Sequence, residues 1–165
     1  MISTDDGLRL HPHHWPASRP EAARGQVLIV HGLGEHAGRY GELAANLHQW
    51  GFAVRAYDQQ GHGQSEGARG DMLSPGSLQA DLCRVIDDTR QRPALAGTPL
   101  ILLGHSMGGL VVARTLAEVN RDREKRAEPF GLADFMPLAH LEEDEAPAET
   151  GTAQDMFDQL NGVHK

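Results

Sequence analysis

Three short, largely apolar runs in this 165-residue chain have the length of buried strands, and they lie at 26–30, 52–57 and 100–103. The first and the last are nearly continuous in apolar residues, which is typical of strands covered by helices on both faces. A further segment, 7–15, alternates weakly and ends before Pro16. We expect an edge strand there.

Apolar residues between these runs recur at the three- and four-residue spacing of helices. The spacing predicts helices at about 40–47 and 77–91, followed by the stop signals Gly51 and Pro93, and a third helix at 110–119. Strands that alternate with helices through short connections predict an α/β protein with a mostly parallel sheet and right-handed crossovers.

Glycine-rich loops follow each of the three predicted parallel strands, at 31–36, 58–67 and 104–109. The carboxyl ends of parallel strands share one edge of a sheet, and ligands of open α/β proteins bind at that edge. The sequence therefore predicts that these three loops lie together and form the functional site.

The third loop, Gly104-His-Ser-Met-Gly-Gly109, has the sequence form of a nucleophile elbow, because it joins a predicted strand directly to a predicted helix. Glycines two residues before and after a serine let the strand and the helix approach closely around it. A serine hydroxyl needs such a turn, and a base beside it, to act as a nucleophile at neutral pH. Ser106 is the candidate catalytic nucleophile, and the alternative interpretation is a simple glycine turn.

The first loop, His31-Gly-Leu-Gly-Glu-His36, follows the first internal strand. In an acyl-transfer site, a loop at this place supplies one backbone N–H to the oxyanion hole. We expect the N–H groups of Leu33 and Met107 to form that hole. Removal of one such donor costs about 100- to 1,000-fold in rate, so the backbone path of this loop matters more than its side chains. The alternative is a glycine turn after a strand.

Composition narrows the class of protein. The net charge is −8 and no basic stripe is present, which argues against nucleic-acid binding. No apolar run approaches the length of a membrane span or of a signal peptide, so we expect a soluble, cytoplasmic protein. The single cysteine, Cys83, excludes an internal disulfide and gives no metal-ligand spacing. We expect a buried structural thiol, with no cofactor and no metal.

Charge divides the chain into two parts. Residues 1–120 hold 12 acidic and 10 basic residues, whereas 121–165 hold 11 acidic and 5 basic residues. The second part begins with a charged helical extension at 121–128, becomes acidic and rich in proline and glycine, and ends with a short amphipathic segment at 156–160. We expect an α/β core at 1–120 and an acidic, poorly ordered or short-helical tail at 121–165.

Together with Tyr57-Asp-Gln-Gln-Gly-His-Gly-Gln-Ser-Glu-Gly67, the loops at 31–36 and 104–109 resemble the monoacylglycerol lipase and lysophospholipase branch of the α/β-hydrolase superfamily, often grouped with serine aminopeptidases of the S33 type. The resemblance covers about residues 5–119. It implies a partial α/β-hydrolase fold and a serine esterase that forms an acyl-Ser106 intermediate from a lipid ester such as a monoacylglycerol, with peripheral lipid contact. It also implies that Asp58, His62, His105 and His36 shape the loops.

The departure from that family lies after the third helix. Members continue with further strands, a cap over the pocket, a late aspartate and a final histidine, and residues 121–165 show none of these patterns. The acids present there are Asp134, Asp144, Asp155 and Asp158, and the bases are His140 and His164. None follows a convincing strand, so we expect a fold that lacks the C-terminal strands and cap, and weak or absent activity.

Two alternatives to an impaired hydrolase remain open at this point. In the first, the chain is a non-catalytic fragment that binds a ligand or associates with itself through an open sheet edge, since unpaired edges favour association. Alternatively, a second chain supplies the missing acid and base.

Overall fold

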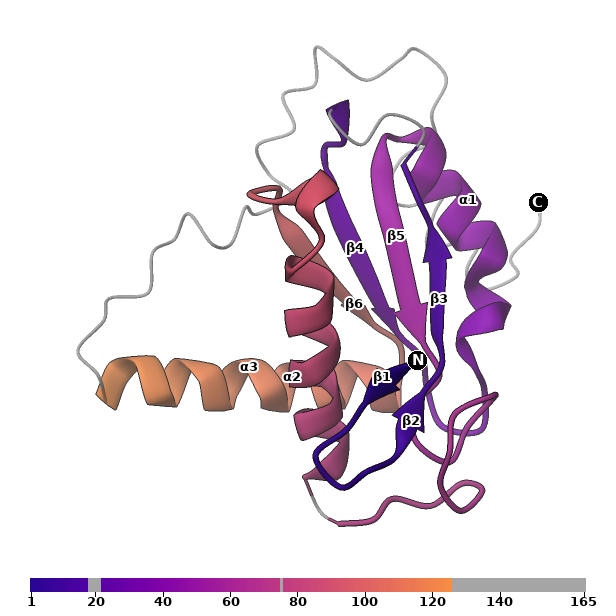
Figure 1. Cartoon of the computed structure of the whole chain (residues 1–165), viewed down its shortest axis with the longest axis vertical. Coiled ribbons are helices and arrows are strands. Elements are labelled where there is room, and N and C mark those ends of the chain that lie inside the picture. Colours follow the sequence, from indigo (N-terminus) through magenta and orange to yellow (C-terminus); the bar gives the residue numbers. More distant parts are fainter. Residues whose placement is uncertain (18–21, 75, 126–165) are drawn as a thin grey trace. The chain divides into compact units, whose positions relative to one another are not determined.

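A four-stranded sheet forms the centre of the computed structural model, which describes residues 1–17, 22–74 and 76–125. These residues belong to the first of the two units into which the chain divides, Met1–Phe130 and Gly131–Lys165. The strand order is β3-β5-β4-β6 (Figure 1), and β4, β5 and β6 run parallel while β3 is antiparallel to β5. The strands are β3 (Pro12–Trp15), β4 (Gly25–Val30), β5 (Phe52–Tyr57) and β6 (Leu100–Gly104).

The helices lie where the apolar spacing predicts them, in alternation with the parallel strands. They are α1 (Gly41–Gln49), preceded by the short 3₁₀ helix η2 (Ala37–Tyr40), then α2 (Ser77–Arg90), η3 (Pro93–Leu95) and α3 (Met107–Lys125). The predicted mostly parallel α/β architecture is therefore confirmed, and each strand predicted at 26–30, 52–57 and 100–103 is present with ends within one residue.

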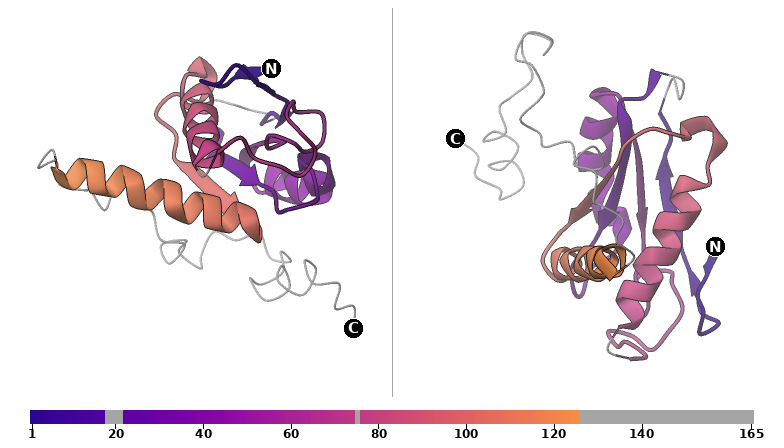
Figure 2. Two further views of the ribbon diagram at one scale, coloured as in Figure 1. Left: turned by 90° about the horizontal axis from the view of Figure 1, so that it is seen from below. Right: turned by 90° about the vertical axis from the view of Figure 1, so that its left-hand side faces the viewer.

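Helices cover both faces of the sheet, with α1 on one face and α2 and α3 on the other (Figure 2). Successive side chains of β4 therefore enter different cores. Val27 and Ile29 pack in the cluster that includes α1, whereas Leu28 and Val30 pack in the cluster that includes α2 and α3. All six residues of β4 are buried, as its continuous apolar run predicts.

Strand β6 is less covered than its apolar sequence predicts. It pairs with β4 on one side, and no second partner strand is present within residues 1–17, 22–74 and 76–125. Ile101 in the middle of β6 is 42% exposed. The described part of the sheet thus ends in an edge strand that carries apolar and uncharged side chains.

The predicted single edge strand at 7–15 is wrong in one respect, because the segment forms two strands in two sheets. β2 (Arg9–Leu10) pairs with β1 (Ile2–Ser3), and only β3 joins the main sheet, as its antiparallel edge. Between them, His11 bonds to the loop after β5: its N–H donates to Ser65 Oγ at 2.8 Å and its carbonyl accepts from the Asp58 N–H at 2.9 Å. These two bonds replace strand pairing at that residue.

The expectation of a buried Cys83 is also wrong, because this thiol is exposed on α2. The core face of α2 is formed by Leu78, Leu82 and Val85, and position 83 falls outside that stripe. Partial burial and the charges of Asp87 and Glu118 raise the pKa of the thiol, which disfavours its thiolate form.

Helix α3 continues without a break through the first residues of the predicted charged extension and reaches Lys125. The predictions for the remainder of the tail fall outside the described residues, and the division at residue 120 stays a prediction. Within the described ranges, no helix combines the length and the hydropathy that a membrane crossing requires.

Asp81 on α2 is a buried acid. It is 3% exposed, and its Oδ2 atom has no hydrogen-bond partner among the described residues. Burial, reinforced by the charge of Asp6, raises the pKa of Asp81 to about 7. Burial and the nearby Asp81 also raise the pKa of the buried Tyr57 hydroxyl. The folded protein therefore favours the protonated form of Asp81.

We predict that Asp81→Asn makes the fold less sensitive to rising pH. An acid whose folded-state pKa is raised stabilises the fold fully below its unfolded pKa, and this contribution is lost as the pH rises through the folded value. Urea denaturation should show the wild-type free energy of unfolding falling relative to Asp81→Asn by on the order of 2–3 kcal/mol between about pH 5 and pH 8. The exposed Asp71→Asn variant is the control, and a difference that is constant with pH would contradict the prediction.

Candidate functional site

Ser106 is held in a backbone conformation that non-glycine residues rarely adopt. Its φ is 51°, and it is the one non-glycine residue with positive φ in the described part of the chain. It lies between the end of β6 and the first residue of α3, and its carbonyl accepts the N–H of Leu110 at 3.2 Å. The immediate change from strand to helix imposes this strain. Ser106 is exposed at this turn.

Glycines around Ser106 permit the close crossing of backbones that this turn requires. A β-carbon on Gly108 would overlap the carbonyl oxygen of Val30 and lie 2.5 Å from that of His31. A β-carbon on Gly104 would lie 2.6 Å from Cα of Gly109. The start of α3 therefore rests directly on the end of β4, and no larger residue fits at either position.

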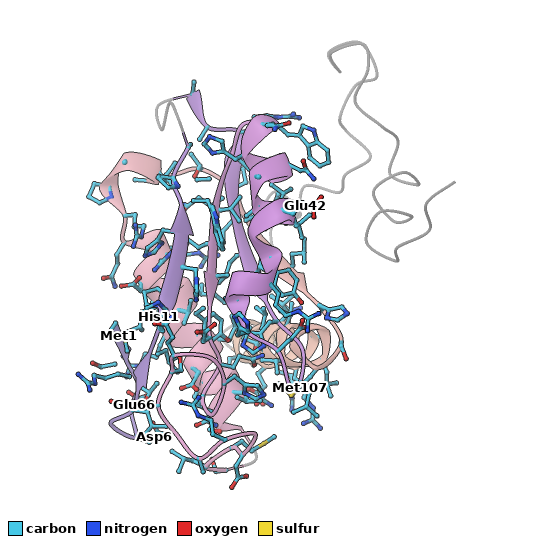
Figure 3. All side chains as sticks on the ribbon, turned by 90° about the vertical axis from the view of Figure 1, so that its right-hand side faces the viewer. Met1, Asp6, His11, Glu42, Glu66 and Met107 are labelled. Carbon is cyan, nitrogen blue, oxygen red and sulfur yellow. The ribbon has the colours of Figure 1, made fainter. Side chains whose placement is uncertain are left out.

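The loop at 31–36 lies against this turn. A β-carbon on Gly32 would lie 3.2 Å from Cβ of Ser106 and 3.2 Å from Nδ1 of His105, and the His105 N–H donates to the Val30 carbonyl at 3.0 Å. Met107, labelled in Figure 3, opens α3 at the carboxyl end of the parallel strands. The first and third predicted loops are thus neighbours.

The Glu35 carboxylate joins these two loops. Its Oε1 atom accepts the Gly32 N–H at 2.5 Å, the Tyr40 hydroxyl at 2.8 Å and Nδ1 of His105 at 2.8 Å. Burial alone would raise the pKa of Glu35, but the hydrogen bonds from His105, Tyr40 and Gly32 outweigh it and lower the pKa to about 2. Because a carboxylate only accepts, His105 carries its proton on Nδ1.

Two buried histidines join the loop at 31–36 to the loop at 58–67. Nε2 of His31 accepts the Gln59 N–H at 2.9 Å, and its Nδ1 donates to the Gly32 carbonyl at 2.7 Å. Nε2 of His62 accepts the Gly34 N–H at 3.2 Å, and its Nδ1 lies 2.9 Å from the Gln60 carbonyl. Burial lowers the pKa of His31. Because its Nε2 accepts an N–H, the ring is neutral, and both of its nitrogens are occupied.

Asp58 holds the start of the loop at 58–67 in place. Its side chain accepts the N–H groups of Ala37 and Gln64, each at 2.8 Å, and Nε2 of His13 lies 3.3 Å away. Burial alone would raise the pKa of Asp58, but the hydrogen bonds from the Gln64 and Ala37 N–H groups and the nearby His13 ring lower it. A carboxylate with these partners is a structural acceptor, which agrees with the loop-shaping role that the resemblance implies.

The structure brings Ser106 and Gly32, the residue before Leu33, together at the start of α3, and the described residues show no base bonded to the serine. Within the described ranges, no hydrogen bond joins Ser106 Oγ to a histidine, and no group of three or more His, Cys, Asp or Glu could hold a metal. The candidate acids and bases in the tail lie outside the described residues: Asp134, Asp144, Asp155, Asp158, His140 and His164.

Sequence reasoning did not single out Glu35 or Tyr40. The available signal was weak, since Glu35 stands three residues after Gly32 in a loop, and Tyr40 falls at the start of the helix predicted at about 40–47. Tyr40 instead ends η2 and turns its hydroxyl toward Glu35.

The mostly parallel sheet with helices on both faces, and the tight turn from β6 into α3, are those of an α/β hydrolase, of which the described residues form a part. The model of the family "serine aminopeptidase, S33" matches residues 21–134. The chain belongs to this family, and it falls in the branch that contains the monoacylglycerol lipases.

Several relatives support this placement. Human monoglyceride lipase is 40% identical over 114 residues, which are 68% of this chain and 36% of that protein. The crystal structure of the monoacylglycerol lipase of Paleococcus ferrophilus is 38% identical, with a TM-score of 0.54, over 69% of this chain and 39% of that one. A soluble variant of Saccharomyces cerevisiae monoglyceride lipase, in complex with a substrate analogue, is 28% identical with a TM-score of 0.57, over 66% and 35%. The chain thus spans little more than a third of the length of these relatives.

We predict that Gly108→Ala is strongly destabilising. The added methyl group must displace the Val30 carbonyl, and overpacking of this kind costs about 1–3 kcal/mol or more. The matched control is Gly41→Ala, at the first residue of α1, where φ is −58° and a β-carbon would meet nothing within 4 Å. Denaturant titration should show no loss for Gly41→Ala, and equal stability of the two variants would contradict the close crossing at Gly108.

Proposed function

We propose that this chain carries the nucleophile and the oxyanion hole of a serine ester hydrolase of the monoacylglycerol lipase type, with Ser106 as the nucleophile and 104–109 as its elbow. The observation that carries the proposal is the positive φ of Ser106 at the junction of β6 and α3, with Gly32 against its side chain. Membership of the serine aminopeptidase S33 family supports it.

In the proposed reaction, Ser106 Oγ forms a bond to the carbonyl carbon of an acyl ester, and the carbonyl electrons move onto the oxygen. The N–H groups of Leu33 and Met107 stabilise this oxyanion. The tetrahedral intermediate then expels the alcohol, leaving an acyl-Ser106 ester that water hydrolyses to a carboxylic acid and the free serine.

Backbone hydrogen bonding supports the choice of these two donors. In the loop, Gly32 donates to Glu35 and Gly34 donates to His62, and the intervening Leu33 N–H has no acceptor within the described residues. Met107 is the first residue of α3, so its N–H has no acceptor inside that helix. Both groups therefore have a free bond to offer to a developing charge.

The proposed substrate is a monoacylglycerol or a related acyl ester. This inference comes from the relatives, several of which are monoglyceride or monoacylglycerol lipases, and one of which is bound to a substrate analogue. The exposed Leu33 and Met72 at the loop edge of the sheet suit contact with an apolar acyl chain.

The reaction also needs a base for the Ser106 proton, and the buried histidines of the loops do not fit that role. His31 uses both nitrogens in loop contacts, and so does His62. A base is worth about 100- to 10,000-fold in rate. We therefore expect slow acylation and little turnover by this chain alone, unless His140 or His164 with one of the tail acids supplies the base.

A second function is favoured by the edge strand β6, whose apolar Ile101 is 42% exposed. Here the chain associates through that edge, either with a second copy or with another polypeptide that contributes a base and an acid. Light scattering that shows a monomer at all concentrations would argue against self-association.

We predict that p-nitrophenyl acetate slowly acylates Ser106 and that turnover stays close to the background rate. Oxyanion stabilisation and binding alone still give about a 1,000- to 10,000-fold advantage over water, which is sufficient for a detectable adduct. Mass spectrometry of the intact chain and of its peptides should locate one acetyl group on Ser106. The adduct should be absent from Ser106→Ala and present in Ser74→Ala, in which another exposed serine is removed.

Two results would contradict this proposal. An acetyl group on other side chains only would remove Ser106 as the nucleophile. Rapid turnover that disappears in Ser106→Ala would keep the nucleophile but show that the chain supplies its own base.

A further inference from the structure

We propose that Glu35 is a positioning residue that aligns the two halves of the oxyanion hole, by fastening the loop at 31–36 to the turn at 104–109. This inference rests on the proposed function, because the hole it aligns is formed by the N–H groups of Leu33 and Met107. Glu35 itself is not placed in contact with the substrate.

The geometry of Glu35 is that of a bridge between the two donor segments. One oxygen, Oε1, holds the Gly32 N–H at 2.5 Å and Nδ1 of His105 at 2.8 Å. Gly32 is one residue before Leu33, and His105 is two residues before Met107. The two proposed oxyanion donors are therefore tied to a single carboxylate oxygen through one and two intervening peptide units.

The same contacts select which amide of the loop is left for the substrate. Three successive N–H groups, at residues 32, 33 and 34, could face the site. Glu35 takes the first and His62 takes the third, so the Leu33 N–H is the free donor. Loss of the Glu35 bond would release the Gly32 amide and let the loop rotate, which would spoil the alignment of Leu33 with Met107.

A carboxylate suits this position better than an amide. Three donors converge on Oε1, from Gly32, Tyr40 and His105, and the side chain of Glu35 is 12% exposed. An ionised oxygen accepts several strong hydrogen bonds at once. The low pKa of Glu35 keeps it ionised across the physiological range, so the bridge persists at any pH at which the enzyme would act.

The test compares Glu35→Gln with Glu66→Gln in the full chain. Glu66 is a suitable control because it also accepts a backbone N–H and an arginine side chain, from Arg9, but it has no contact with the turn at 104–109. The rate of Ser106 acylation by p-nitrophenyl acetate should fall about 10- to 100-fold in Glu35→Gln, because small displacements of catalytic groups cost up to about 100-fold. Glu66→Gln should change it less than about 2-fold.

A spectroscopic measurement separates this inference from the proposed function. In ¹⁵N NMR spectra, Glu35→Gln should shift the amide signals of Gly32, Leu33 and Met107 together and reduce the Nδ1–H tautomer of His105. Glu66→Gln should leave all of these unchanged. If the wild-type chain is not acylated, the proposed function fails, and the NMR result alone decides whether Glu35 aligns the two segments.

Two outcomes would overturn the positioning role. One is an unchanged acylation rate in folded Glu35→Gln, and the other is a set of amide shifts confined to Gly32. Should Glu35→Gln not fold, His105→Ala removes the other end of the same bridge at a side chain that is 63% exposed. It should shift the Leu33 amide and slow acylation about 3- to 10-fold, and no effect on either would likewise overturn the inference.

Discussion

The close crossing of α3 over the end of β4 is the constraint on which the rest of the site depends. Gly108 rests on the carbonyl oxygens of Val30 and His31, and this contact brings the first turn of α3 against the loop that follows β4. The helix must then start directly after β6, which forces Ser106 to a φ of 51°. Strain at the serine and the absence of side chains at the glycines are two consequences of one packing requirement.

Hydrogen bonds from buried polar side chains then hold three loops in fixed relative positions. His31 and His62 each accept a backbone N–H from the loop to which the other one belongs. Asp58 accepts the N–H of Ala37, which follows the first loop, and that of Gln64 in its own loop. Buried polar groups of this kind are stable only when they are satisfied, so a change in one loop is felt by the next. Glu35 extends the same network to the turn that carries Ser106.

Sequence patterns predicted the elements of this fold well, because each parallel strand is short, apolar and followed by glycines. They predicted less well where a single residue departs from the pattern of its neighbours. His11 bonds to the loop after β5 and splits the expected first strand, and the exposure of Cys83 depends on the phase of a helix whose core stripe is narrow. Glu35 could not be identified, because its role arises from a contact with His105, 70 positions away, that no local spacing encodes.

The chemistry of the buried histidines restricts where a base for Ser106 can come from. A general base needs a nitrogen lone pair directed at the hydroxyl, and a neutral imidazole has only one. In His31 and His62 that lone pair accepts a backbone N–H, of Gln59 and Gly34 respectively. Recruitment of either ring would break the loop contact that leaves the Leu33 N–H free, so the same step that gained a base would lose an oxyanion donor. The loops can therefore position the nucleophile and the hole, but neither of these two buried rings can take the proton while it also holds its loop in place.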